Sequence, residues 1–115
     1  MKPLEVAQHY FDLSNESNFD EIKKLFSDTT TYSSQNTGIY LGVDSIIEMQ
    51  KQFHAQFKNL HWHVNSVEEV KPGVILFDST FKATSISGEA VEALGIEYVV
   101  VDGGKIVHVE IRNNT

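Results

Sequence analysis

The second half of the chain alternates apolar and polar residues with a period of two, and this pattern restricts the fold more than any other feature. Four segments carry it: LHWHVNSVEEV (60–70), GVILFDSTFKATSIS (73–87), EAVEALGIEYVVVD (89–102) and KIVHVEIRN (105–113). The residues KPG, SGE and GG separate them and favour tight turns. Because successive side chains of a strand point to opposite faces, the pattern predicts four long antiparallel strands with one buried face.

The first half has helical spacing instead. Pro3 suits a first helical turn, and apolar residues then recur at steps of three and four: Leu4, Val6, Ala7, Tyr10, Phe11 and Leu13. After a break at 15–18, Ser17 or Asn18 can cap a second helix, whose inner face is Phe19, Ile22, Leu25 and Phe26. A third helix is predicted from the Gly42–Asp44 region to Lys58, with Ile46, Ile47, Met49, Phe53 and Phe57 inward. Between the second and third helices, TTTYSSQNTGIYLG predicts two short strands around a polar loop.

Composition excludes several classes of function. The chain has 115 residues and is expected to form a single domain, 1–115. Its net charge of −7 opposes nucleic-acid binding, which depends on neutralising phosphates. It has no cysteine, so disulfides, thiol catalysis and cysteine metal sites are excluded. No apolar run is long enough for a membrane span, and Glu5 and Asp12 interrupt any signal-peptide pattern, so we expect no membrane contact and a cytoplasmic location.

Three stretches carry a resemblance to a known family: FDEIKKLFSDTTTY (19–32), YLGVDSIIEM (40–49) and GIEYVVVDGGKIVHVEI (95–111). With the order of elements, they make the chain similar to the NTF2-like superfamily, and within it to the SnoaL-like and ketosteroid-isomerase-like branch. The fold that this implies is α+β, a cystatin-like cone with three N-terminal helices packed on a curved antiparallel sheet. The resemblance also implies a deep pocket between helices and sheet, and a homodimer formed through the outer sheet face.

Glu97 is the residue that connects this pattern to chemistry. It has the same parity as Val99 and Val101, so it is predicted to point into the pocket. By similarity to the isomerases, Tyr10 and Glu97 take the positions of a tyrosine and a protonated acid that together stabilise an oxyanion. The residues leave another interpretation open, in which Tyr10 is a core tyrosine and Glu97 reaches the rim or pairs with a cation.

The general base of these enzymes has no counterpart. The place of the isomerase base falls at Ser34, and no acid occurs between Asp28 and Asp44. In SnoaL-type cyclases the corresponding acid lies near the end of the last strand, where this chain has Asn113. The epoxide hydrolases of this superfamily need an inward Asp–Arg–Asp set, whereas Arg112 has the outward parity together with His108 and Glu110.

The remaining pocket candidates are mostly aromatic or apolar. On the last strand, Val107, Val109 and Ile111 are predicted to face inward. The predicted ligand contacts are Tyr32, Ser34, Tyr40, Trp62, Phe77, Val99, Val109, Ile111 and Asn113, and simple core packing is the alternative.

The histidines do not suggest a metal site. His61 and His63 share the face opposite Trp62 and have no third ligand, so neither a metal nor another cofactor is expected. If the parity of that strand were reversed, His63 would be the base candidate. His9 and His54 are predicted at the surface or the rim.

These observations favour a small-molecule-binding protein whose apolar pocket ends in Tyr10 and Glu97. Whether it also catalyses an isomerase- or cyclase-like reaction stays open, because no base is identified. The alternative is a non-catalytic dimeric protein-association module of the same fold, whose working surface is the outer sheet face.

Overall fold

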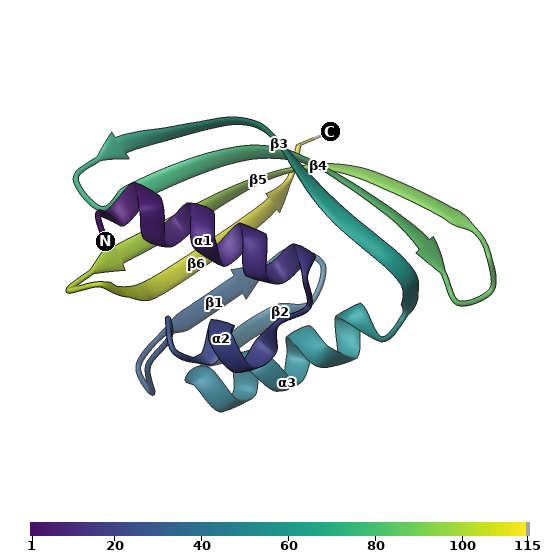
Figure 1. Ribbon diagram of the computed structural model, residues 1–115, viewed down its shortest axis with the longest axis horizontal. Helices are drawn as coiled ribbons and strands as arrows, with labels where there is room; N and C mark the ends of the chain where they lie inside the picture. The colour runs from purple at the N-terminus through teal and green to yellow at the C-terminus, as the bar shows by residue number, and fades with distance from the viewer. Residues whose placement is uncertain (115) are drawn as a thin grey trace.

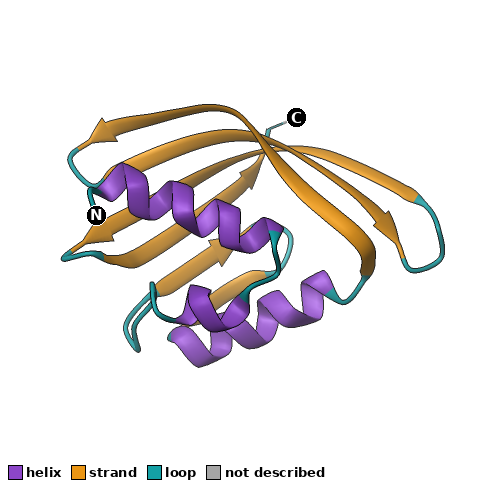
Figure 2. Ribbon diagram, viewed as in Figure 1, coloured by secondary structure: helices purple, strands orange, loops and turns teal. Residues whose placement is uncertain are grey.

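The computed structural model describes residues 1–114 and contains a curved six-stranded sheet (Figures 1 and 2). The strands are β1 (Thr31–Ser34), β2 (Gly38–Leu41), β3 (Phe57–Lys71), β4 (Val74–Ser85), β5 (Ala90–Asp102) and β6 (Lys105–Asn113). Their order across the sheet is β2-β1-β6-β5-β4-β3. The four long strands form the predicted antiparallel meander. The expectation of a purely antiparallel sheet is wrong, because β1 runs parallel to β6.

Three helices pack on the concave side of this sheet: α1 (Pro3–Asn15), α2 (Phe19–Lys23) and α3 (Val43–His54) (Figure 1). The side chain of Asn18 caps α2, as predicted, by accepting a hydrogen bond from the backbone N–H of Glu21. The third helix ends four residues earlier than the periodicity indicated, since Phe57 and Lys58 already belong to β3. None of the helices within residues 1–114 is long and apolar enough to cross a membrane.

Parity along the strands follows the prediction except at one position. In β5, Glu97, Val99 and Val101 are buried between more exposed neighbours, as expected. In β6, Val100 pairs with His108 while Val101 pairs with Ile106, so Val107 is an extra residue in a bulge. The prediction that Val107 faces inward is therefore wrong, and Ile106 is the fully buried residue instead.

The space between helices and sheet is divided into a closed part and an open part. In the closed part, residues of the sheet such as Ile75, Val99 and Ile106 are fully buried under α1 and α2. Phe11 of α1 stacks on Phe77 of β4, with ring centroids 4.0 Å apart. The open part is the pocket described next. Its wall includes Ser79, Glu97 and Ile111, which are the next inward-facing residues after Phe77, Val99 and Val109 on β4, β5 and β6.

Candidate functional site: a pocket with a buried carboxyl group

The pocket lies between the C-terminal halves of α1 and α3 and the concave face of the sheet. Its volume is about 120 Å³. Most of its wall is apolar and aromatic: Phe11, Phe53, Trp62, Phe81 and Ile111 contribute to it. A concave, mainly apolar cavity with a few polar groups is typical of a small-molecule site.

Glu97 is placed at the boundary between core and pocket. Its side chain is only 7 % exposed, and its cross-strand neighbours on the sheet are Phe77 and Ile111. No hydrogen bond or ion pair to its carboxyl group is present among residues 1–114, although the residue lines the pocket. Burial in these surroundings raises its pKa from 4.5 to about 8. The group is therefore mainly a neutral carboxylic acid at pH 7, able to donate a hydrogen bond.

Tyr10 and Gln50 form the second polar feature of the pocket. Tyr10 of α1 is 4 % exposed, and its hydroxyl oxygen accepts a hydrogen bond of 2.9 Å from Nε2 of Gln50 on α3. Burial raises the pKa of Tyr10 well above its ordinary value, and the nearby Glu97 adds to this rise. Because its oxygen accepts from Gln50, the Tyr10 hydroxyl keeps its own proton for donation to another group.

The aromatic neighbour Tyr32 completes this end of the pocket. It is 7 % exposed on β1, and burial raises the pKa of its phenol, with Tyr10 and Glu97 contributing. All three residues line the pocket, and the nearby Glu97 contributes to the raised pKa of both phenols. Their arrangement is a set of neutral hydrogen-bond donors in a site with little water, which is suited to hold an oxygen atom of a ligand.

Of the other predicted ligand contacts, five line the pocket and four do not. Those in the wall are Tyr32, Ser34, Trp62, Ile111 and Asn113. Phe77, Val99 and Val109 are fully buried in the closed part of the core, and Tyr40 packs against its edge. Parity predicted the inward direction of Phe77, Val99 and Val109, and Tyr40 was a candidate because it is aromatic, but none of the four is part of the pocket wall.

Sequence reasoning missed Gln50 and underestimated His54. Gln50 is a polar residue inside the apolar stripe of α3, three residues after Ile47 and three before Phe53, and that position was a readable signal. His54 follows at the end of the same helix and lines the pocket, in keeping with the predicted rim position. Its Nδ1 shares a 2.8 Å hydrogen bond with the Ser17 hydroxyl, and burial lowers its pKa from 6.5 to about 4.

Neither Ser34 nor the histidines of β3 are placed to act as a base in the pocket. Ser34 is buried in the pocket wall, where its hydroxyl accepts a hydrogen bond from the backbone N–H of Asn36. His61 and His63 are exposed on the opposite face from Trp62, so the parity used for β3 is confirmed. No cluster of three metal-ligating side chains occurs in the part of the chain that the structure describes.

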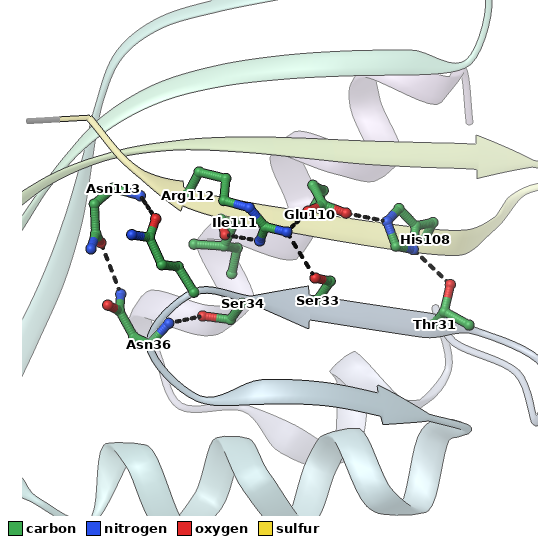
Figure 3. A network of polar contacts seen from close by, with 10 residues as sticks. Thr31, Ser33, Ser34, Asn36, His108, Glu110, Ile111, Arg112 and Asn113 are labelled. Atoms are coloured by element: carbon green, nitrogen blue, oxygen red, sulfur yellow. Dashed lines mark hydrogen bonds and ion pairs between the residues drawn. The ribbon is translucent and has the colours of Figure 1, made fainter.

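The outward residues of β6 form a polar network with β1, away from the concave face (Figure 3). Nδ1 of His108 lies 2.6 Å from the Thr31 hydroxyl, and its Nε2 lies 2.9 Å from Oε1 of Glu110. The Arg112 guanidinium pairs with Glu110 and donates to the Ser33 hydroxyl at 3.2 Å. The hydrogen bond with His108 and the charge of Arg112 hold the pKa of Glu110 below its ordinary value. Arg112 is thus engaged outside the pocket, although it also reaches the rim.

Solved structures show the same fold at low sequence identity. A cystatin-fold protein of Novosphingobium aromaticivorans matches with a TM-score of 0.85 and 16 % identity, over 98 % of this chain and 99 % of that one. A protein with a ketosteroid-isomerase-like fold from Catenulispora acidiphila, solved with trimethylamine, has a TM-score of 0.84 and 13 % identity, covering 94 % and 84 %. An LEH-like epoxide hydrolase of M. tuberculosis has a TM-score of 0.84 and 11 % identity, covering 97 % and 82 %.

The sequence itself identifies the family. No protein with a curated description matches it. The family model described as the SnoaL-like domain, however, matches residues 7–109, which include most of α1, all of α2 and α3, β1 to β5 and the first half of β6. The expected resemblance is therefore confirmed, and this chain belongs to the SnoaL-like domain family.

Proposed function

We propose that this chain, acting as a single domain, binds a small and mainly apolar organic molecule through an oxygen atom held by Tyr10 and Glu97. The observation that carries the proposal is the buried and unpaired carboxyl group of Glu97 at the inner end of an apolar pocket. A buried acid without a partner destabilises a fold, so it needs a compensating interaction or a function. A neutral acid beside a phenol offers two donors to one ligand oxygen.

The pocket wall indicates the kind of molecule that would fit. The rings of Phe53, Trp62 and Phe81 pack together along one side, with Trp62 and Phe81 centroids 4.8 Å apart. Such a wall suits a flat aromatic or alicyclic body. Tyr10, Gln50 and Glu97 add buried polar groups to this mainly apolar wall, so we expect the ligand to carry an oxygen on an apolar frame.

A catalytic role of the isomerase or cyclase type would need a proton acceptor in the same pocket. Ser34 and Asn113, which occupy the places of the known bases, cannot serve as one. His54 is neutral at pH 7 and lines the pocket, so it is the residue that we would assign to this role. The proposal itself is limited to binding, because it depends only on the donors at the inner end.

Binding can be tested with β-naphthol, whose fluorescence reports its environment and whose hydroxyl group resembles the proposed ligand oxygen. Wild type is expected to bind it, and Glu97→Leu to lose at least tenfold in affinity through loss of one donor. Glu97→Gln keeps a donor and should retain most of the binding. Equal affinity of wild type and Glu97→Leu would contradict the proposed role of Glu97.

The second candidate function, a protein-association module, is favoured by the outer face of the sheet. Val74, Leu76, Ile96, Tyr98 and Val100 are adjacent across β4 and β5 on the side away from the helices. We name these five residues the outer apolar patch. A surface of this kind suits a homodimer contact in either function. The open pocket supports the binding function, since an association module has no need of a cavity with a buried acid.

A further inference from the structure

The side-chain amide of Gln50 has one satisfied end and one unsatisfied end. Its nitrogen donates to the Tyr10 hydroxyl oxygen at 2.9 Å. Its oxygen, Oε1, is buried and accepts no hydrogen bond within residues 1–114. The residue is only 6 % exposed and lines the pocket, so this is a polar atom held out of water at the ligand site. A buried acceptor without a donor is costly, and the loss is recovered when a ligand supplies the donor.

Gln50 brings this acceptor to the part of the pocket that contains the donor Tyr10. Since the amide nitrogen is bonded to Tyr10, the amide oxygen lies close to the same end of the pocket. A ligand oxygen that serves both residues accepts from Tyr10 and donates its own proton to Oε1 of Gln50. One hydroxyl group can make both contacts, whereas a carbonyl, an ether or an anionic oxygen can make only the first.

The charges around the pocket also favour a neutral ligand. The chain has a net charge of −7, and no lysine contributes to the pocket wall described above. Arg112 reaches the rim but is exposed and paired with Glu110 on the outer face. An anionic ligand would enter this pocket without a buried cation to balance it, which is unfavourable in an apolar site.

We propose that Gln50 is a specificity-determining residue that makes the pocket select a neutral hydroxyl group, as in a phenol, enol or alcohol, over a carbonyl, ether or phenolate oxygen. This inference rests on the proposed function and narrows it to one class of ligand. Tyr10 and Glu97 donate to the ligand oxygen, and Gln50 accepts its proton. If the Gln50 amide were flipped, so that Oε1 and Nε2 exchanged places, Nε2 would face the ligand and the pocket would prefer an oxygen without a proton. Which of the two ligand types binds more tightly therefore tests the orientation of the amide.

The experiment compares β-naphthol with its methyl ether, which keeps the oxygen acceptor but has no proton to donate. Affinities are measured below pH 7, where Glu97 is neutral. Wild type is expected to bind the naphthol about tenfold more tightly than the ether, the effect of one hydrogen bond. Gln50→Met should bind the two probes within about twofold of each other, because its side chain has a similar shape and no strong acceptor. Gln52→Met, an exposed residue of the same helix, is the matched control and should behave as wild type.

A spectroscopic readout separates this role from a structural one. Absorbance distinguishes naphthol from naphtholate, and wild type should raise the pKa of bound naphthol relative to free naphthol. Gln50→Met should reduce that rise. It removes both a buried acceptor without a partner and the hydrogen bond to Tyr10, two opposing effects, so its melting temperature should stay close to that of wild type. A lower melting temperature with equal loss of both probes would show that Gln50 is only structural and would overturn the inference.

The two proposals fail in different ways. Equal binding of naphthol and ether by wild type, or a preference that persists in Gln50→Met, would overturn the role of Gln50. Binding that still depends on Glu97 would leave the proposed function standing in that case. If wild type binds neither probe, the proposed function fails, and the selectivity that rests on it fails too.

Discussion

Glu97 is an acid whose surroundings, rather than its neighbours in sequence, decide its chemistry. It lies between Phe77 and Ile111 on the concave side of the sheet, and no cation of residues 1–114 forms an ion pair with it. Its pKa rises to about 8 because the ionised form would be buried without compensation. The same property that makes it a donor at pH 7 also makes the stability of the fold depend on pH.

The contribution of Glu97 to the stability of the free protein should fall as pH rises, and the fall of the total should be clearest above pH 6.5, where the opposing contribution of His54 is complete. Below pH 4.5 Glu97 is protonated in both folded and unfolded chains, and above about 8 it is ionised in both. Between these values only the folded state keeps the proton, so this residue lowers the free energy of unfolding by up to about 1.4 kcal/mol per pH unit. Urea unfolding at several pH values measures the slope.

Glu97→Gln is the control for this prediction. The amide has nearly the same shape and does not titrate, so the contribution of residue 97 to the slope should disappear. A slope between pH 5 and 8 that is the same in wild type and in Glu97→Gln would show that Glu97 ionises normally in the folded protein.

At the scale of elements, one side chain joins α1 to the edge of the sheet. Asn15, the last residue of α1, donates from Nδ2 to the Trp62 carbonyl oxygen at 3.0 Å and accepts from the Trp62 N–H at 2.7 Å. β3 is an edge strand that pairs only with β4, so these two backbone groups face away from the sheet. The Asn15 amide satisfies both of them, which fixes the strand and with it the Trp62 wall of the pocket.

Asn15→Leu should therefore destabilise the protein by about 2 kcal/mol, since it leaves two partly buried backbone groups without partners. Thermal unfolding measures the loss. Trp62 is the only tryptophan of the chain, so its fluorescence should shift to the red as the strand edge loosens. Asn15→Asp keeps the acceptor but loses the donor, so its stability should lie between that of wild type and that of Asn15→Leu. An unchanged melting temperature and spectrum in Asn15→Leu would contradict this role.

At the scale of the whole molecule, the two sides of the sheet have different properties. The concave side carries the core and the pocket, whereas the outer side carries the outer apolar patch beside the polar network of β6 and β1 (Figure 3). Tyr98 of the patch is opposite Glu110 of the network, so the apolar and the charged region border each other between β5 and β6. Ile39 and Leu41, 83 % and 65 % exposed, form separate apolar surface on β2, on the other side of the polar network.

We expect the protein to be a homodimer through this outer face. Tyr98→Glu would place a carboxylate in the patch and next to Glu110, and it should convert the dimer to a monomer while the fold is kept. Light scattering after gel filtration at micromolar concentration measures the mass, and circular dichroism checks the fold. Gln52→Glu, an exposed change on α3 and away from the outer face, should leave the mass unchanged. A monomeric wild type would contradict the expected dimer.

The period-two pattern was sufficient to predict the four long strands, because alternation on a half-buried sheet depends only on successive residues. It also predicted that Glu97 points inward with Val99 and Val101. The family resemblance placed Tyr10 near the same end of the cavity. The missed bulge at Val107 shows the limit of parity, since one extra residue changes the face of those before it.

Sequence by itself thus determined the elements, the family and the inward direction of Glu97. Only the tertiary structure decided where the core ends and the pocket begins, so that Phe77, Val99 and Val109 are covered while Glu97 and Ile111 reach the cavity. It alone paired β1 in parallel with β6, and Tyr10 of α1 with Gln50 of α3. The physical reason is that direction along a strand is a local property, whereas cover and pairing depend on segments that are distant in the chain.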